Sequence, residues 1–377
     1  QKVFNEWSKS ALEVRTTANL LKQLDFDFFE VLDSVTIARS RKHIKRYYDT
    51  SDIGSFPARN KPISLRPSLT NLPKAINYEE VYEQLMELTL AIYTPSNYIL
   101  ASKLNKYIDQ DAGAKNNLSQ LGREQGIRRL MSINLLKRME SSVHSFKLTI
   151  QRIYANYTGT LRLIGEFQTG KNSSVEERVE ATDFDLDDQN MDIFNVGRKF
   201  QIDLRDIDLL SFERDLRADL EVLALLISMI EDITPEHDLK LNELFRILGQ
   251  KIENPINPDN KKLLIFTAFS DTAEYLYTHV SAFIKNKYGL NTAIVTGSID
   301  GRTTIPRFHV EMNTILTCFS PISKEKGLIM PNDTNVIDVL IGTDCISEGQ
   351  NLQDCDYVIN YDIHWNPVRI IQRFGRI

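Results

Sequence analysis

The segment Lys261-Lys-Leu-Leu-Ile-Phe-Thr267 decides the fold of this chain. A short apolar run closed by a threonine is typical of a strand that is buried on both faces. Similar runs recur at 292–296, 336–342 and 357–361, and helical patterns separate them. Strands that alternate with helices predict an α/β fold, built on a parallel sheet with right-handed crossovers.

The stretches between the predicted strands favour helices. We expect helices over 271–287 and 304–316, and a further helix that begins at Pro367. Gly289 suits the end of the first of these, because glycine readily adopts the left-handed conformation found after helices. The segment Ser320–Gly327 is interpreted as an inserted loop, since the chain between the neighbouring elements is longer than a minimal crossover needs.

Polar residues gather where the predicted strands end. They are Thr267, Thr296, Gly297, Thr343, Asp344 and Asp362. In open parallel sheets, ligands bind outside the carboxyl ends of the strands. We therefore expect the functional site along this edge of the sheet.

The chain before the sheet has a helical pattern. Apolar residues over 136–157 recur at steps of three and four, which predicts one long helix with an apolar face. A second stripe of this kind spans 209–230. Thr234-Pro235 predicts the start of the next helix, and Gly249 predicts its end.

Two polar stretches interrupt the helical region. Residues 171–195 contain eight acidic side chains and no helical stripe, so we interpret them as a solvated acidic loop. They lack the spacing of a calcium-binding loop. The sequence Gly165-Glu-Phe-Gln-Thr-Gly-Lys171 fits the spacing of a phosphate-binding loop. It is followed by Asn172 rather than Ser or Thr and follows a helix, so we expect it not to bind phosphate.

Composition excludes several classes of protein. Lys plus Arg number 45 and Asp plus Glu 51, so the formal charge is −6 and a globally basic nucleic-acid coat is excluded. No run approaches the roughly 20 apolar residues of a membrane span. The three cysteines and six scattered histidines have no disulfide or metal-ligand spacing, which favours a reducing cytoplasm. The chain begins with Gln1 and stops within a helical pattern, so we expect a piece of a longer protein.

Three segments near the end of the chain point to phosphate chemistry. They are Ile341-Gly-Thr-Asp-Cys-Ile-Ser-Glu-Gly-Gln-Asn-Leu352, Tyr357-Val-Ile-Asn-Tyr-Asp-Ile-His-Trp-Asn-Pro367 and Gln372-Arg-Phe-Gly-Arg376. A polar turn between strands offers N–H groups and hydroxyls to phosphates. Arginines on the helix that follows suit the charge of a polyphosphate.

In this order and spacing, the three segments resemble motifs V and VI of superfamily-2 helicases. The Asn-Tyr-Asp-x-x-Trp-Asn-Pro run resembles the Snf-type (SWI/SNF-like) branch, and Leu263–Asp271 resembles motif IV. More weakly, Thr36–Ile44 with Phe56-Pro57 resembles the end of lobe 1, and His237–Leu241 resembles the segment that leads into lobe 2.

The resemblance implies a division of the chain into three parts. Residues 1–75 would be the tail of a RecA-like lobe 1 and a crossing linker. Residues 76–255 would be a helical insertion that includes the acidic loop. Residues 256–377 would be a RecA-like lobe 2, truncated within motif VI.

The resemblance also implies roles for individual residues. Arg376 matches the motif VI arginine that faces the nucleotide's γ-phosphate, and Gln372 and Arg373 open the same motif beside the nucleotide. Gly349 matches the motif V glycine, and Asn351 the position that contacts the ribose. The positions expected to touch the nucleic-acid backbone are Thr267, Thr296, Gly297 and Thr343.

The chain departs from the family pattern in two ways. The last arginine of motif VI would lie three residues after Arg376, beyond Ile377, and lobe 1 is almost entirely missing. ATP with Mg²⁺ would be bound mainly by lobe 1, so we expect no tightly bound cofactor and no ATP hydrolysis by this piece alone.

The implied function is that of an ATP-dependent translocase or remodelling motor. Its expected partners are duplex DNA and lobe 1 of the same parent chain, with no membrane. Three alternatives stay open at this point. They are a strand-separating helicase, a non-catalytic scaffold that docks a protein partner at the helical arm or acidic loop, and a motor subunit of a restriction or defence system.

Overall fold

The computed structural model describes residues 59–72, 77–104, 106–107, 120–169, 202–297, 300–346, 349–364 and 366–376. The chain divides into two compact units, residues 1–65 and 66–377, and all elements below belong to the second. The segments 36–44 and Phe56-Pro57 and the acidic loop 171–195 lie outside the described residues.

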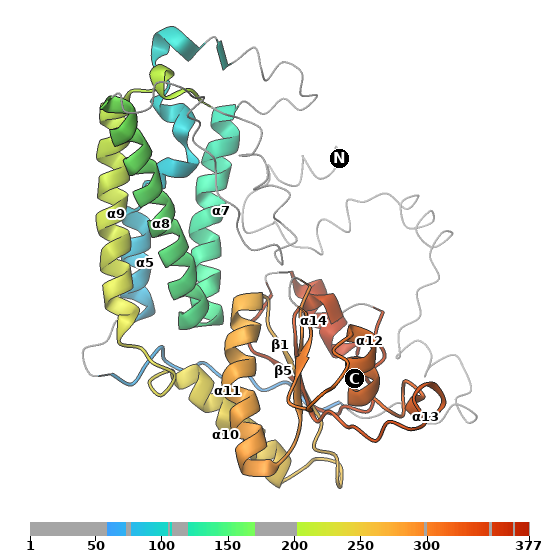
Figure 1. The fold of residues 1–377 in the computed structure, drawn as a ribbon. Helices are drawn as coiled ribbons and strands as arrows, with labels where there is room; N and C mark the ends of the chain where they lie inside the picture. Colours follow the sequence, from blue (N-terminus) through green and yellow to red (C-terminus); the bar gives the residue numbers. More distant parts are fainter. Residues whose placement is uncertain are drawn as a thin grey trace, which may run out of the picture. The chain divides into compact units, whose positions relative to one another are not determined.

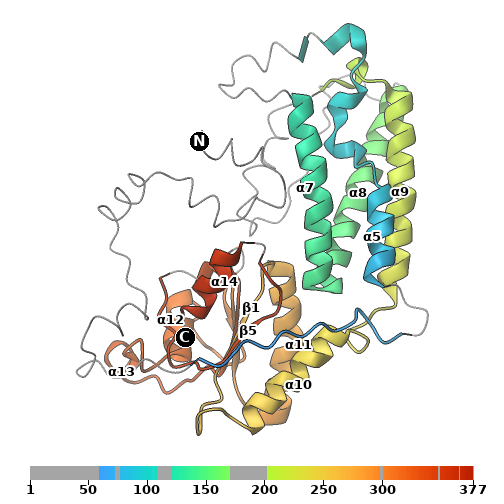
Figure 2. The same cartoon turned by 180° about the vertical axis from the view of Figure 1, so that it is seen from behind.

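The first part of the second unit is a helical arm. Its helices are α5 (Tyr78–Glu87), α7 (Gln120–Ser141), α8 (Val143–Gln168) and α9 (Leu209–Glu231), with 3₁₀ turns at 91–93, 95–98, 101–103 and 204–206. Figures 1 and 2 show α7, α8 and α9 side by side. Their apolar stripes meet in one core, in which Phe146 and Ile150 of α8 and Phe212 of α9 are fully buried.

The single long helix predicted over 136–157 is wrong, because two helices occupy this segment. The backbone at Ser142 is extended, with φ −158° and ψ 147°, and its Oγ accepts the N–H of Ser145 at 3.0 Å. Ser142 therefore caps a new helix. The apolar spacing continues across the break, so Met139 and Val143 are both buried and the pattern alone does not reveal the interruption.

The second part of the unit is a sheet lobe. Its elements are α10 (Leu239–Glu253), β1 (Leu263–Phe266), α11 (Ser270–Tyr288), β2 (Thr292–Val295), β3 (Arg302–Thr303), α12 (Met312–Phe319), α13 (Lys326–Ile329), β4 (Val339–Gly342), a 3₁₀ turn (Asp344–Ile346), β5 (Val358–Asn360) and α14 (Pro367–Phe374). The five-stranded sheet has the order β3-β2-β4-β1-β5. Only the β2–β3 pair is antiparallel.

Each central strand is buried on both faces. In β1, Leu263 and Ile265 pack with α10 and α11, whereas Leu264 and Phe266 pack with the α12 side. Figure 1 shows these helices on opposite faces of the sheet. Two covered faces explain why the strand is a continuous apolar run. The predicted fold class, a RecA-like parallel-sheet lobe preceded by a mainly helical region, is confirmed.

The start of the sheet lobe differs from the prediction. Helix α10 is capped by Asp238, whose Oδ1 accepts the N–H groups of Lys240 and Leu241, rather than by Thr234. Gly249 lies inside this helix, which ends at Glu253. The buried leucines of α10 belong to the core of the sheet, so the packing of the lobe begins at α10 instead of residue 256.

Two crossovers also differ in detail. The helix predicted over 304–316 is α12, which spans Met312–Phe319, because the chain first forms the edge strand β3. The segment interpreted as an inserted loop leads into the short helix α13. The helix end predicted at Gly289 is present, since this glycine follows α11 with φ 69°.

None of the helices in the described ranges is long and apolar enough to cross a membrane.

Candidate nucleotide and nucleic-acid site

The predicted site residues share one edge of the sheet. The register pairs Phe266 with both Gly342 and Asn360, and Val295 with Gly342, in parallel strands. The residues that follow these positions therefore leave the sheet at the same edge. Thr267, Thr296, Thr343 and Asp362 are gathered there, as their places after the strands indicate.

Helix α14 carries Arg373 into this edge. Asn366 begins the helix by accepting the N–H of Val368 through its side-chain oxygen, at 3.0 Å. Arg373 is fully buried, and its Nε donates to Asp344 Oδ1 at 2.7 Å. Its Nη1 donates to Asn360 Oδ1 at 3.2 Å and to the carbonyl oxygen of Asp362 at 3.4 Å. One guanidinium thus joins the ends of β4 and β5.

This burial changes the role expected of Arg373. Its guanidinium lies 5.2 Å from the centre of the Phe266 ring and has no exposed surface. In this conformation the side chain has no exposed surface to offer a nucleotide, in contrast to the direct contact that the sequence predicted. Arg373 instead fixes the position of α14 on the sheet.

Arg376 lies against the polar loop after β4. Its Nη1 donates to the carbonyl of Gln350 at 3.3 Å, and its own carbonyl accepts the N–H of Leu352 at 3.1 Å. Gly349, at φ 70°, and Asn351 are exposed in the same loop. The residues predicted to surround a nucleotide on this lobe are therefore neighbours along one surface, with Gln372 half-buried beside them.

Two guanidinium nitrogens of this cluster are buried without an acceptor among the residues that the structure describes. They are Nη2 of Arg373 and Nε of Arg376. An unpaired buried donor costs about 1–3 kcal/mol. The donor of the half-buried Arg376 fits an anionic group, because guanidinium nitrogens bind phosphate oxygens well.

The threonines expected to touch nucleic acid are mostly covered. Thr267 is fully buried and donates to Asp362 Oδ2 at 2.6 Å. The Thr343 hydroxyl donates to the Cys345 sulfur at 3.5 Å, and only 3% of Thr343 is exposed. Thr296 is 9% exposed, whereas Gly297 is open to solvent. The edge is assembled as predicted, but most of its hydroxyls face inward.

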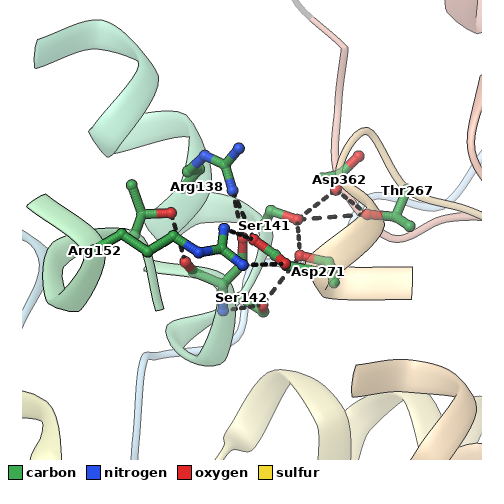
Figure 3. A network of polar contacts seen from close by, with 10 residues as sticks. Arg138, Ser141, Ser142, Arg152, Thr267, Asp271 and Asp362 are labelled. Atoms are coloured by element: carbon green, nitrogen blue, oxygen red, sulfur yellow. Dashed lines mark hydrogen bonds and ion pairs between the residues drawn. The ribbon is translucent and has the colours of Figure 1, made fainter. Parts of the chain in front are cut away.

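The helical arm contributes residues that sequence reasoning missed. Ser141, at the end of α7, donates to Asp362 Oδ2 at 2.6 Å. Arg138 Nη1 donates to Asp271 Oδ2 at 3.1 Å, although only 1% of the arginine side chain is exposed. Figure 3 shows these side chains converging from α7, α8 and the sheet lobe. The only signal in the sequence was a pair of serines within an apolar stripe.

Two basic groups near this edge have lowered pKa values. Burial lowers the pKa of His364, and the negative charge of Asp344 partly offsets this effect. Burial likewise lowers the pKa of Lys240, against the opposing charge of Asp362. Lys240 donates to the carbonyls of Glu140 and Ser141, at 2.5 and 2.9 Å. Burial is therefore the larger influence on both groups.

Two other candidate sites receive no support. Across the described ranges, no group of three or more His, Cys, Asp or Glu side chains is placed to hold a metal ion. Residues 165–168 form the last turn of α8, so the lookalike of a phosphate-binding loop follows a helix instead of a strand. Its last two residues, Gly170 and Lys171, lie outside the described part.

Comparison with known families agrees with this geometry. Residues 240–377 match the family described as the helicase conserved C-terminal domain. This match begins within α10, where the packing of the sheet lobe also begins. It supports a superfamily-2 helicase-type lobe.

Three curated relatives share parts of the chain. The uncharacterised ATP-dependent helicase YqhH of Bacillus subtilis is 58% identical over 41 residues, which is 11% of this chain and 7% of that protein. A protein of Schizosaccharomyces pombe described as ATP-dependent DNA helicase fml2 is 28% identical, over 36% of this chain and 16% of its own. The mitochondrial ATP-dependent RNA helicase MRH4 of Kluyveromyces lactis is 26% identical, over 38% of this chain and 28% of its own length.

The chain therefore spans at most 28% of the curated relatives it matches. Among solved structures, the Hef helicase domain of Pyrococcus furiosus is similar at 15% identity and a TM-score of 0.36. The similarity covers 79% of this chain and 49% of that one.

Proposed function

We propose that this chain is part of an ATP-dependent nucleic-acid motor of the Snf-type branch, which translocates on duplex DNA or remodels a complex on it. One observation carries the proposal. Arg373 in α14 and Arg376 just after it are bound to the polar loop and strand end at 344–352, at the carboxyl edge of a parallel sheet. The helicase C-terminal match covers the same residues.

The arginine cluster suits half of a nucleotide site. Guanidinium groups stabilise the charge that develops on a transferring phosphoryl group. In the proposal, Arg376 faces the γ-phosphate, while Gly349 and Asn351 line the nucleotide side of the loop. ATP with Mg²⁺ would be held mainly by lobe 1 of the parent chain. The isolated 377-residue chain is expected to hydrolyse essentially no ATP.

The test is ATP turnover by the full-length parent protein, without nucleic acid and with duplex DNA, single-stranded DNA or RNA. Duplex DNA should raise turnover many-fold. Arg376→Ala should reduce the stimulated rate about 10³-fold, as loss of an arginine that stabilises transition-state charge does. Arg217→Ala is the control, because this exposed arginine pairs with Glu213 on its own helix, α9.

Each outcome has a clear meaning. No stimulation by any nucleic acid, or an Arg376→Ala variant as active as wild type, would reject the motor. Stimulation by RNA alone would keep the motor and reject the duplex-DNA substrate. One relative is named a DNA helicase and another an RNA helicase, so both nucleic acids must be tested.

A strand-separating helicase is the second candidate, because all three curated relatives are named as helicases. A labelled duplex separates the two functions. A helicase releases the labelled strand, whereas a translocase displaces a bound protein and leaves the strands paired. A defence-system motor would show the same turnover and differ in the domains that flank it.

A partner-binding scaffold is the non-enzymatic alternative. Deletion of 171–195 should leave nucleic-acid-stimulated turnover unchanged if the chain is a motor. If the deletion abolishes capture of a protein partner and the parent has no turnover, the scaffold replaces the motor.

A further inference from the structure

A chain of buried hydroxyl groups joins the helical arm to the sheet lobe; we call it the elbow joint. It consists of Ser141 and Ser142, between α7 and α8, and Thr267, Thr272 and Asp362 of the lobe. Ser141 lies 2.6 Å from Asp362 and 2.8 Å from Thr272. Ser142 lies 3.1 Å from Thr272. All five residues are at most 5% exposed.

One assignment of protons satisfies every hydroxyl in the joint. Ser142 donates to Thr272, Thr272 donates to Ser141, and Ser141 donates to the Asp362 carboxylate. Thr267 donates to the same oxygen of Asp362 at 2.6 Å. Each hydroxyl then donates once, and this series of hydrogen bonds ends on a charged acceptor, which makes the bonds strong and directional.

An ion-pair cluster flanks the joint. Asp271 accepts hydrogen bonds from Arg138 at 3.1 Å and from Arg152 at 3.0 and 3.2 Å. The Arg138 guanidinium also lies 4.6 Å from the centre of the Phe269 ring. Arg138 belongs to α7 and Arg152 to α8, so both arm helices are held at the start of α11.

Asp362 connects this joint to the arginine helix. Its Oδ1 accepts the N–H of Ala268 at 2.8 Å, and its carbonyl oxygen accepts from Arg373 Nη1 at 3.4 Å. One residue therefore holds the arm through its carboxylate and α14 through its main chain. A movement of Ser141 alters the surroundings of the residue that supports Arg373.

The joint is polar where a rigid interface would be apolar. The core of the arm and the two cores of the sheet lobe are separate apolar clusters. Polar interfaces between domains are typical of parts that move relative to each other. Buried hydrogen bonds are lost at a large cost when their geometry is disturbed, so such a joint favours discrete positions over gradual displacement.

We propose that the elbow joint couples the position of the helical arm to the arginine helix α14, with Asp362 as the positioning residue. Nucleic acid that contacts the arm would thereby influence α14, which Arg373 holds on the sheet, and through α14 the placement of Arg376 at the nucleotide. This inference rests on the proposed function, and it states how nucleic-acid binding and ATP hydrolysis would be coupled.

The experiment measures one ratio in the full-length parent protein. It is the ATP turnover with saturating nucleic acid divided by the turnover without it. This ratio does not depend on the fraction of protein that is active, so loss of folded protein leaves it unchanged. Ser141→Ala should lower the ratio about fivefold or more, the usual lower range of an energetic coupling between sites. Affinity for nucleic acid and KM for ATP should change little.

Ser132→Ala is the matched control. This serine lies on the same helix, and its hydroxyl donates to the Arg128 carbonyl of that helix. Its ratio should equal that of wild type. Asp362→Asn should lower the ratio as Ser141→Ala does. The carboxylate uses one oxygen for the two hydroxyls and the other for the Ala268 N–H, whereas an amide has one acceptor oxygen and cannot serve both sides. The double variant should be no worse than Asp362→Asn alone, since both changes break one shared contact.

Three results separate the possible failures. If wild type is stimulated and Ser141→Ala has the wild-type ratio, the coupling is rejected and the motor stands. If Ser141→Ala and Asp362→Asn have independent, multiplying effects, the shared route through Asp362 is rejected. If wild type shows no stimulation at all, the proposed function fails first and the coupling fails with it. Should Asp362→Asn not fold, Ser141→Ala decides the question.

Discussion

Arg373 shows how the surroundings of a side chain decide its role. Its place in the segment 372–376 predicted a contact with nucleotide, as for Arg376. The structure buries it against Asp344, Asn360 and the Phe266 ring. A residue next to a site can thus support the site without touching its ligand.

At this scale we predict that Arg373→Ala lowers the free energy of unfolding by about 3 kcal/mol. The substitution removes the cation from a mostly buried Asp344 and two donors from the end of β5, and breaking such a pair is strongly destabilising. Chemical denaturation of the 377-residue chain measures the change. Arg369→Ala, on the same helix but half-buried, should cost less than about 1 kcal/mol. Equal costs for the two variants would contradict the assignment.

At the scale of elements, caps decided where helices begin. Both Thr234 and Asp238 could cap α10, because Thr and Asp are both good N-cap residues. Asp238 is the cap because it is 97% buried and its second oxygen accepts a hydrogen bond, at 2.9 Å, from the hydroxyl of Tyr275 in helix α11. The contact with another element, invisible in the local sequence, settles the position of the cap.

This choice predicts unequal effects of two alanine substitutions. Asp238→Ala should destabilise the chain by about 1–2 kcal/mol or somewhat more, because the helix loses its cap and Tyr275 loses its acceptor. Thr234→Ala should change stability by about 0.5 kcal/mol or less, since the Thr234 hydroxyl is exposed and its contact with His237 is exposed too. Thermal unfolding of the two variants checks this. A larger loss for Thr234→Ala would place the cap at the residue that the sequence favoured.

At the scale of the whole second unit, separate cores imply separable stability. Asp219 of α9 is buried in the arm, where it accepts hydrogen bonds from Thr89, Ala91 and Tyr157 at 2.7 to 3.0 Å. None of these partners belongs to the sheet lobe. Burial, and secondly the charge of Asp219, raises the pKa of Tyr157, which therefore stays protonated and donates.

We expect Asp219→Ala to destabilise the arm by about 3 kcal/mol, because several buried donors lose their acceptor together. Amide hydrogen exchange should become faster in α8 and α9 and stay unchanged in β1 and β4. Glu221→Ala, at an exposed position of the same helix, should alter neither region. Faster exchange of β1 in parallel with α8 would mean that the cores unfold as one unit.

Local patterns by themselves determined most of the architecture. Apolar runs of strand length predicted the parallel sheet, because a strand covered on both faces has no polar side to show. The order of polar residues after the strands predicted that they meet at one edge of the sheet, which the register confirms. The resemblance of the segments at 341–352 and 372–376 to helicase motifs agrees with the helicase C-terminal match, while the Snf-type branch stays a prediction.

Only the tertiary structure decided which of these polar residues face outward. Thr267 and Arg373 are buried by contacts with Ser141 and Asp344, and Ser141 meets Asp362 from 221 residues away. A local sequence pattern reports periodicity and turn chemistry, which depend on neighbours along the chain. Burial and hydrogen-bond partners depend on which distant surfaces meet, and that is settled only when the arm packs against the sheet.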